Sequence, residues 1–298
     1  MKQLKVLIIG GNGMLGHKLV QKLGHAFEVS TTIRSSWSDV ARFGIFDESN
    51  TFTNVDVNDL SRVIGCIEAT EPDVVVNAVG IIKQLPNAQN VEDVLSLNSI
   101  FPNRLSTLAS KYGFRLICIS TDCVFSGDRG GYQESDIPDA RDLYGQSKRW
   151  GEVDAANCLT IRTSIIGREL SSSHSLVEWF LTNRGSTIKG FSNAIYSGFP
   201  TVVFADIIRR LITEMPGLAG IYHISSDPVN KFDLLTLVRN EFRLDIEIER
   251  DETFRIDRSL DSSRFRQLSG FIPRPWSEMI AEMASDQTPY DKWKNQEF

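Results

Sequence analysis

A glycine-rich turn between a strand and a helix constrains the fold of this chain more than any other feature. The strand-like run Lys5–Ile9 leads into the sequence Gly-Gly-Asn-Gly-Met-Leu-Gly at residues 10–16, and helical periodicity follows over residues 15–23. In such a turn the first glycine permits a tight reversal, the middle one lets a phosphate approach, and the last lets the helix pack on the strand. Because free amides and the helix dipole point at a bound anion there, the turn predicts the pyrophosphate site of a dinucleotide. Its predicted cofactor contacts are Gly10, Gly13, Met14, Leu15 and Gly16.

Short apolar runs alternate with amphipathic stretches over the first half of the chain. The apolar runs are typical of strands buried on both faces, and the stretches between them have helical periodicity. The expected strands are residues 5–9, 28–33, 74–78, 116–120 and 159–163, and the expected helices are 15–23, 60–70, 99–112 and 147–156. This rhythm predicts an α/β fold with a doubly wound parallel sheet of the Rossmann type.

The alternation breaks after about residue 167. Residues 176–183 have a helical pattern, residues 188–196 read as short and irregular, and a helix over 201–215 and a strand over 220–225 follow. A helix near 232–242 and a charged, strand-like segment at 245–249 come before a proline-containing tail. We therefore expect two domains. The nucleotide-binding domain covers 1–167 with roughly 197–224, and a smaller α+β C-terminal lobe for the substrate covers 168–196 and 225–298.

Composition excludes several classes of partner. The net charge of −6 and the pI near 5.4 give no general attraction to nucleic acid or to an anionic membrane, so neither is expected as a partner. The four cysteines lack a metal-knuckle or disulfide-framework spacing, and the apolar run at the N-terminus is too short for a signal peptide or a membrane span. We expect a cytoplasmic protein. His174 and His223 are isolated in the sequence, and no metal site is expected.

Three further strand ends are candidates for contact with the cofactor. Arg34 stands eighteen residues past Gly16, where an NAD-binding protein usually places an acidic residue. A guanidinium there can pair with a 2′-phosphate, which favours NADPH over NADH; the alternative is a solvated surface arginine. The other candidates follow later strands, and for each of them a purely structural role is as plausible as contact with the cofactor. They are Asp56, Val57, Ala78, Val79 and Gly80.

A hydroxyl, a phenol and an ammonium form a candidate catalytic set. Thr121 follows the strand expected at 116–120, and Tyr144 and Lys148 are four residues apart, which puts them on one helical face. An ammonium beside a phenol favours the phenolate, so Lys148 is expected to lower the pKa of Tyr144 toward the working pH. Thr121 can orient a substrate oxygen. The Tyr-x3-Lys spacing alone is common on helix surfaces, but behind a glycine turn and a Ser-Thr-Asp strand end it predicts catalysis.

Three segments together resemble the extended short-chain dehydrogenase/reductases. Residues 10–16, 120–125 and 144–152 are similar to those of the dTDP-4-dehydrorhamnose reductase family and its sugar-nucleotide relatives, and the Gly-Phe-Pro-Thr stretch at 198–201 fits as well. The resemblance implies hydride transfer from NADPH or NADH to a nucleotide-linked 4-keto-6-deoxy sugar. Such a reaction serves the synthesis of precursors of cell-surface polysaccharide.

The resemblance also implies roles for individual residues. Tyr144 would donate a proton to the C4 oxygen of the sugar, with Lys148 as its partner and Thr121 as the hydroxyl of the triad. Asn98 falls where related reductases keep a structural or proton-relay asparagine, and a helix N-terminal cap is an equal alternative. A nucleotide diphosphate sugar needs cationic and polar partners, for which arginine is well suited. The candidate substrate contacts are Lys83, Asp122, Val124, Arg258 and Arg264.

Departures from the family pattern leave the substrate and two other functions open. Residues 80–84 and 257–262 look more like a branch whose members reduce UDP-linked amino-deoxy sugars. One alternative is a cofactor-binding regulatory subunit without catalysis, as the regulatory subunit of methionine adenosyltransferase resembles this family. The other is a sugar-nucleotide epimerase, which usually needs a further acid/base pair. A homodimer is left open as the oligomeric state.

Overall fold

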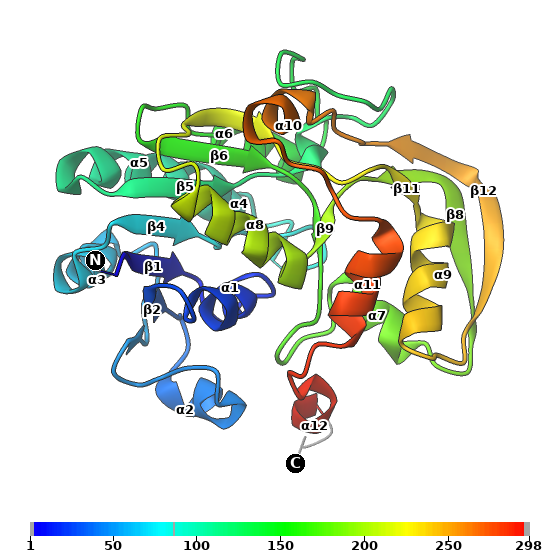
Figure 1. Ribbon diagram of the computed structural model, residues 1–298, viewed down its shortest axis with the longest axis horizontal. Coiled ribbons are helices and arrows are strands. Elements are labelled where there is room, and N and C mark those ends of the chain that lie inside the picture. The colour runs from blue at the N-terminus through cyan, green and yellow to red at the C-terminus, as the bar shows by residue number, and fades with distance from the viewer. Residues whose placement is uncertain (1–2, 86, 295–298) are drawn as a thin grey trace.

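The computed structural model describes residues 3–85 and 87–294, which fold around a seven-stranded sheet (Figure 1). Its strands are β1 (Lys5–Ile9), β2 (Glu28–Thr32), β3 (Thr51–Phe52), β4 (Val74–Asn77), β5 (Arg115–Ile119), β6 (Cys158–Arg162) and β10 (Gly220–His223). The strand order is β10-β6-β5-β4-β1-β2-β3, and every neighbouring pair is parallel. The expected doubly wound Rossmann architecture is confirmed.

Helices cover both faces of this sheet. They include α1 (Gly16–Leu23), α3 (Leu60–Thr70), α5 (Phe101–Tyr112), α6 (Leu143–Trp150) and α8 (Thr201–Thr213). Because side chains alternate along a strand, Val6 and Ile8 of β1 pack in one hydrophobic cluster with α1 and α8, whereas Leu7 and Ile9 pack in another with α3 and α5. Each such burial contributes about 1.5–3 kcal/mol. No helix in the described parts of the chain is long and apolar enough to cross a bilayer.

A second, smaller lobe is built around a three-stranded sheet. Its elements are α7 (Leu176–Thr182), β8 (Thr187–Tyr196), β11 (Val229–Asn230), α9 (Lys231–Glu241), β12 (Glu247–Asp257), α10 (Ser263–Ser269) and α11 (Trp276–Ala284). In this sheet β8 is central, antiparallel to β11 and parallel to β12. Two short strands, β7 (Ile165–Ile166) and β9 (Phe199–Pro200), form a separate parallel pair. In the chain, β7 comes between β6 and β8, and β9 comes between β8 and β10. The arrowheads of β1, β4 and β6 point toward this lobe in Figure 1.

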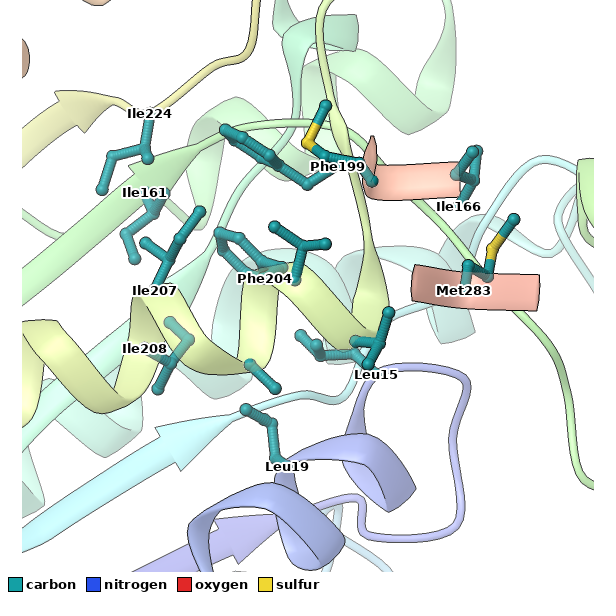
Figure 2. Close-up of a cluster of buried hydrophobic side chains, with 14 of the residues drawn as sticks. Leu15, Leu19, Ile161, Ile166, Phe199, Phe204, Ile207, Ile208, Ile224 and Met283 are labelled. Atoms are coloured by element: carbon teal, nitrogen blue, oxygen red, sulfur yellow. The ribbon is translucent and has the colours of Figure 1, made fainter. Parts of the chain in front are cut away.

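One hydrophobic cluster runs through both lobes. Figure 2 shows Leu15, the residue before α1, and Leu19 of α1 near Phe204 and Ile208 of α8, with Met283 of α11 at the side of the second lobe. The two lobes therefore share a continuous core, and the carboxyl ends of the large sheet are held against the second lobe.

Two segments differ from the sequence-based expectation for the second lobe. Residues 188–196, expected to be irregular, form the ten-residue strand β8, and the expected short strand at 245–249 is the start of the longer β12. The sequence of β8 lacks apolar alternation, and the strand exists because it pairs with β12 from Thr187 to Ile195. Such long-range pairing is not encoded in local periodicity.

The helices near the candidate catalytic residues also differ in their bounds. A helix was expected at 147–156, but α6 begins at Leu143, where the Asp142 carboxylate accepts a hydrogen bond from the Gly145 amide at 3.0 Å. The helix ends at Trp150 and is followed by Gly151, where a Cβ would lie 1.8 Å from the Asn98 carbonyl oxygen, so the close approach of these two segments requires glycine. The helix expected at 99–112 is preceded by α4 (Val91–Leu95) and a π-helical turn at 96–100.

A C-terminal segment packs on the helix that follows the glycine turn. The short helix α12 (Tyr290–Lys294) places the Tyr290 hydroxyl 2.7 Å from His17 Nε2, and His17 Nδ1 lies 2.8 Å from the Gly13 carbonyl oxygen. Lys18 forms an ion pair with Asp286 beside this contact. Burial lowers the pKa of His17 to about 3, so its ring is neutral at physiological pH. This segment thus supports α1 directly behind the glycine turn.

Candidate active site

The glycine turn lies at the carboxyl end of β1 and is fixed by contacts within the protein. The amides of Gly10 and Gly11 donate to the Thr32 carbonyl oxygen at 3.1 and 2.9 Å. A Cβ on Gly16 would lie 2.0 Å from the Gly10 carbonyl oxygen, and Gly10 itself has a φ of 90°, which favours glycine. These two glycines are therefore required by the turn itself.

Gly13 differs from its neighbours because the protein does not require a glycine there. Its φ lies outside the left-handed region, and a Cβ would meet only the Gly10 carbonyl oxygen, at an ordinary 3.4 Å. The missing side chain leaves space outside the turn, and no side chain caps the amides that begin α1. Space beside uncapped amides at a helix N-terminus fits the pyrophosphate of a dinucleotide. Gly10, Gly13, Met14, Leu15 and Gly16 would hold such a cofactor.

Replacing Gly13 by alanine is expected to weaken NADPH binding about tenfold or more, because the new methyl group occupies the space for phosphate. The free energy of unfolding should change by less than about 1 kcal/mol. The matched Gly16→Ala change should instead destabilise the fold by about 1–3 kcal/mol through overpacking. Fluorescence titration and urea unfolding measure the two effects; equal NADPH affinity in Gly13→Ala and wild type would contradict the assignment.

The other predicted cofactor residues follow neighbouring strands of the same sheet edge. Arg34 is exposed just past β2, and Asn12 Nδ2 in the glycine turn donates to Ser35 Oγ at 3.3 Å, so this loop adjoins the turn. Asp56 is exposed and accepts the Asn58 amide at 2.9 Å. After β4, the side chain of Val79 lies against the glycine turn, because a Cβ on Gly10 would be 2.8 Å from Val79 Cγ2. Ala78 and Gly80 are its neighbours in the chain. Val57 is buried in the core.

Thr121, Tyr144 and Lys148 meet at the carboxyl end of β5. The Lys148 ammonium is buried and donates to the Ile119 carbonyl oxygen at 2.7 Å. Thr121 Oγ1 donates to Asp122 Oδ1 at 3.1 Å, and its side chain lies within hydrogen-bonding reach of the Tyr144 phenol. The turn of α6 between the phenol and the ammonium, together with the strand end, therefore brings all three groups to one place.

The pKa of Tyr144 differs from the sequence-based expectation. Burial raises the pKa of this phenol, and the nearby Cys123 and Asp122 act in the same direction. The prediction that this pKa is lowered is wrong, because burial of the phenol outweighs the effects that favour the phenolate. Burial lowers the pKa of Lys148 itself, against the opposing effect of Cys118 and Glu152. Tyr144 is therefore a protonated phenol at neutral pH and can act as an acid.

Asn98 joins the loop after β4 to helix α6. Its Oδ1 accepts the Ile81 amide at 2.9 Å, and its Nδ2 donates to the Ile81 carbonyl oxygen at 3.0 Å and to Ser147 Oγ at 3.2 Å. Asn98 is not an N-terminal cap, since it lies inside the π-helical turn and Asn90 caps α4. Widened turns of this kind are frequent at functional sites. A Cβ on Gly80 would lie 3.1 Å from Asn98 Oδ1 and 3.8 Å from Lys148 Nζ.

Three of the five predicted substrate contacts lie around the triad. The Lys83 ammonium lies 5.6 Å from the centre of the Tyr144 ring and pairs with Asp142 Oδ2 at 2.9 Å. Asp122 is buried beside Thr121, and burial raises the pKa of its carboxyl, against the effect of Arg258. The Arg258 side chain donates to the Phe125 carbonyl oxygen at 2.9 Å.

The other two predicted contacts are placed elsewhere. Val124 is fully buried in a cluster with Phe125, Tyr132 and Leu260, so its side chain supports the strand end. Arg264 lies over the Tyr222 ring at 4.1 Å and donates to the Ile221 carbonyl oxygen on the outer strand β10. We therefore do not include Val124 or Arg264 in the candidate active site.

Two groups near the triad were missed by sequence reasoning. Lys231 and Tyr196, from α9 and β8 of the second lobe, both have Asp122 and Cys123 as electrostatic neighbours. A signal for Lys231 exists in the sequence, because it follows the cap Asn230, where a cation opposes the helix dipole. Tyr196 has no comparable signal, since its strand was not expected.

The sheet, the glycine turn and the tyrosine–lysine helix together define an extended short-chain dehydrogenase/reductase with a Rossmann fold. The chain belongs to the family described as the RmlD substrate binding domain, whose model matches residues 4–288.

Similar proteins span nearly the whole chain. The spore coat polysaccharide biosynthesis protein SpsK of Bacillus subtilis (strain 168) is 24% identical over 298 residues, 95% of this chain and 98% of SpsK. dTDP-4-dehydrorhamnose reductase of Aggregatibacter actinomycetemcomitans is 24% identical and covers 80% of this chain and 79% of its own. Methionine adenosyltransferase 2 subunit beta of Xenopus laevis is 23% identical, over 93% and 80%. The fold matches dTDP-4-dehydrorhamnose reductase from Bacillus anthracis str. Ames in complex with NADP at a TM-score of 0.77 and 22% identity, over 94% and 98%.

Proposed function

We propose that this protein reduces the keto group of a nucleotide-linked 4-keto-6-deoxy sugar with NADPH or NADH. The observation that carries the proposal is the position of Thr121, Tyr144 and Lys148 at the carboxyl end of β5, on the sheet edge that also carries the glycine turn. The family and the polysaccharide-biosynthesis relatives support the same substrate class. The substrate would be either the dTDP-linked 4-keto-6-deoxy sugar or a UDP-linked amino-deoxy sugar. The product would enter the synthesis of cell-surface polysaccharide.

The residues of the chain divide the work on the carbonyl oxygen. Tyr144 donates its phenolic proton to this oxygen, and the Thr121 hydroxyl donates a hydrogen bond that orients it and stabilises its developing charge. Lys148 supplies a positive charge behind the phenol as the proton leaves. A bound NADPH or NADH would supply the hydride to the carbonyl carbon, and hydride and proton together would convert the ketone to an alcohol.

The experiment that tests this function follows NADPH and NADH oxidation with a panel of dTDP-, UDP- and GDP-linked 4-keto-6-deoxy sugars. We expect turnover of at least one member of the panel, with the alcohol as product. If the protein binds NADPH but reduces no sugar of the panel, the reductase function is lost. An inverted hydroxyl with no net cofactor oxidation would instead identify an epimerase.

Changing Arg34 to alanine is expected to weaken NADPH binding about 10–100-fold and to leave NADH binding within about twofold, because the guanidinium would pair with the 2′-phosphate. Its exposed position past β2 supports this role. The exposed Arg184 after α7 provides the control, since Arg184→Ala removes the same charge elsewhere. Equal losses for both cofactors would show that Arg34 does not distinguish them.

A regulatory subunit is the second candidate, favoured by the similarity to methionine adenosyltransferase 2 subunit beta. A protein that only binds has no chemical need for Thr121, Tyr144 and Lys148 at the same end of the sheet. The turnover panel separates the two candidates, because a regulatory subunit binds the dinucleotide without consuming it.

We also propose that the protein acts in the cytoplasm as a homodimer. All four cysteines are free thiols, which suits a reducing compartment.

Ile100 and Trp150 expose 46% and 56% of their surface and line one shallow surface region between α5 and α6, as a self-association surface would. Sedimentation velocity would measure the mass in solution, and a monomer at micromolar concentration would contradict the dimer.

A further inference from the structure

Lys231 lies in the second lobe at the first position of α9, the helix labelled beside β8 in Figure 1. Its ammonium lies 4.2 Å from the centre of the Tyr196 ring, and the titratable groups that raise its pKa against burial are Asp122 and Cys123. Asn230 already caps the helix through its hydrogen bond to the Asp233 amide at 2.8 Å. The lysine therefore adds no cap, and its charge opposes the helix dipole. Its position is unfavourable for the isolated helix.

Tyr196 presents a second group to the same place. Its hydroxyl is buried, and among the described residues none completes a hydrogen bond with it, although Ser164 lies beside it. A buried hydroxyl without a partner costs about 1–3 kcal/mol. Asp122 and Cys123 are its electrostatic neighbours too, so this hydroxyl and the Lys231 ammonium face the same strand end.

Cations outnumber carboxylates around this strand end. Arg258 also faces it, since its guanidinium donates to the Phe125 carbonyl oxygen at 2.9 Å and lies 3.6 Å from Cys123 Sγ. Asp122 is the carboxylate facing both cations, and one of its oxygens is engaged by Thr121. The nearby Asp142 carboxylate is already paired with Lys83 at 2.9 Å. Lys231 and Arg258 therefore face Asp122 with one positive charge in excess, beside the Thr121 hydroxyl that bonds to Asp122.

We propose that Lys231 and Tyr196 bind a phosphate oxygen of the substrate, with Arg258 on the other side of the same diphosphate. This assignment rests on the proposed function, in which a nucleotide diphosphate sugar places its keto group at Thr121 and Tyr144. The ammonium then gains a charge-assisted hydrogen bond, and the phenol gains the partner that it lacks in the free protein. The second lobe thereby recognises the charged part of the substrate, while the triad acts on the carbonyl.

The test is calorimetric titration of UDP, dTDP and inorganic pyrophosphate into the NADPH-loaded protein. Lys231→Met should weaken UDP or dTDP binding about 10–100-fold, through loss of one charged hydrogen bond, and leave the Kd for NADPH within about twofold. Lys231→Arg should restore most of the affinity. The control is Lys189→Met in the same lobe, whose lysine is 67% exposed and pairs with Asp251, and it should bind all probes as wild type does.

Two further measurements separate binding from a structural role. Tyr196→Phe should lower UDP affinity without lowering the midpoint of thermal unfolding, because it removes a hydroxyl that has no partner in the free protein. Burial lowers the pKa of Lys231 to about 8, so wild-type affinity should fall as the pH rises from 7 to 9 while that of Lys231→Met stays level. Burial raises the pKa of Cys123 to about 12 and also raises the pKa of Tyr196 well above its usual value, so neither titrates in this interval.

The outcomes distinguish this inference from the proposed function. Unchanged UDP and dTDP binding in Lys231→Met, or equal losses for NADPH and the nucleotides, overturns it. Failure of the wild type to bind any of the three probes also overturns it. If the wild type binds UDP or dTDP through Lys231 but reduces no sugar of the panel, the phosphate site stands and the reductase function falls.

Discussion

Replacing Tyr144 by phenylalanine is expected to lower kcat for sugar reduction by about 10²–10⁴-fold and to leave the Kd for NADPH within about twofold. The change removes the proton donor but keeps the aromatic ring that packs in α6. Because burial raises the pKa of Tyr144, the wild-type phenol stays protonated through neutral pH. Steady-state NADPH oxidation at saturating substrate measures kcat, and fluorescence titration measures cofactor affinity.

The matched control for this change is Tyr112→Phe. Tyr112 ends α5, and its hydroxyl donates to the Glu68 carboxylate at 2.7 Å, away from the triad. Its loss should leave kcat within about twofold. A fall of less than about fivefold in the Tyr144 variant would mean that the acid is another group.

The second large effect concerns the ion pair between Arg162 and Glu152. Both side chains are only 4% exposed, and they are joined by two hydrogen bonds of 2.7 and 2.8 Å. Arg162→Met would leave a buried carboxylate without its cation, and the free energy of unfolding should fall by about 3–5 kcal/mol. Ser120 and His223 also bond to this pair, so the loss affects the strand ends beside the triad. Urea unfolding measures the change.

A double variant gives the control for the ion pair. In Arg162→Met with Glu152→Gln the buried charge is removed together with its partner, and much of the lost stability should return. The exposed pair of Arg210 and Glu214 on α8 offers a comparison, since Arg210→Met should cost less than about 1 kcal/mol. A double variant as unstable as the single one would show that packing, not charge, dominates at Arg162.

The elements that surround the glycine turn could be predicted from the sequence because their patterns are local. The strands β1, β4, β5 and β6 are buried on both faces, so short apolar runs identify them. In contrast, β8 owes its existence to pairing with β12 some sixty residues later, and its polar residues give no strand pattern. Local reasoning therefore succeeded for the large sheet and failed for the small one.

The candidate site divides in the same way. Spacing along one helix was enough to place Tyr144 and Lys148 together, and the strand end placed Thr121 beside them. The direction of the pKa shift of Tyr144 could not be predicted, because it depends on burial and on Cys123 and Asp122, which reach the phenol through the fold. Lys231 reaches the same place from another lobe. No spacing in the sequence connects it to the triad.

The packing of Tyr290 on His17 has a consequence for how the protein is made. The two residues are 273 positions apart, so a ribosome completes the glycine turn and α1 long before the partner of His17 emerges. During that interval the face of α1 that α12 later covers stays open to water. Contacts between such distant segments close late, because the entropy of a long loop must be overcome first. The turn expected to hold the cofactor is thus translated early and reaches its final packing among the last steps of folding.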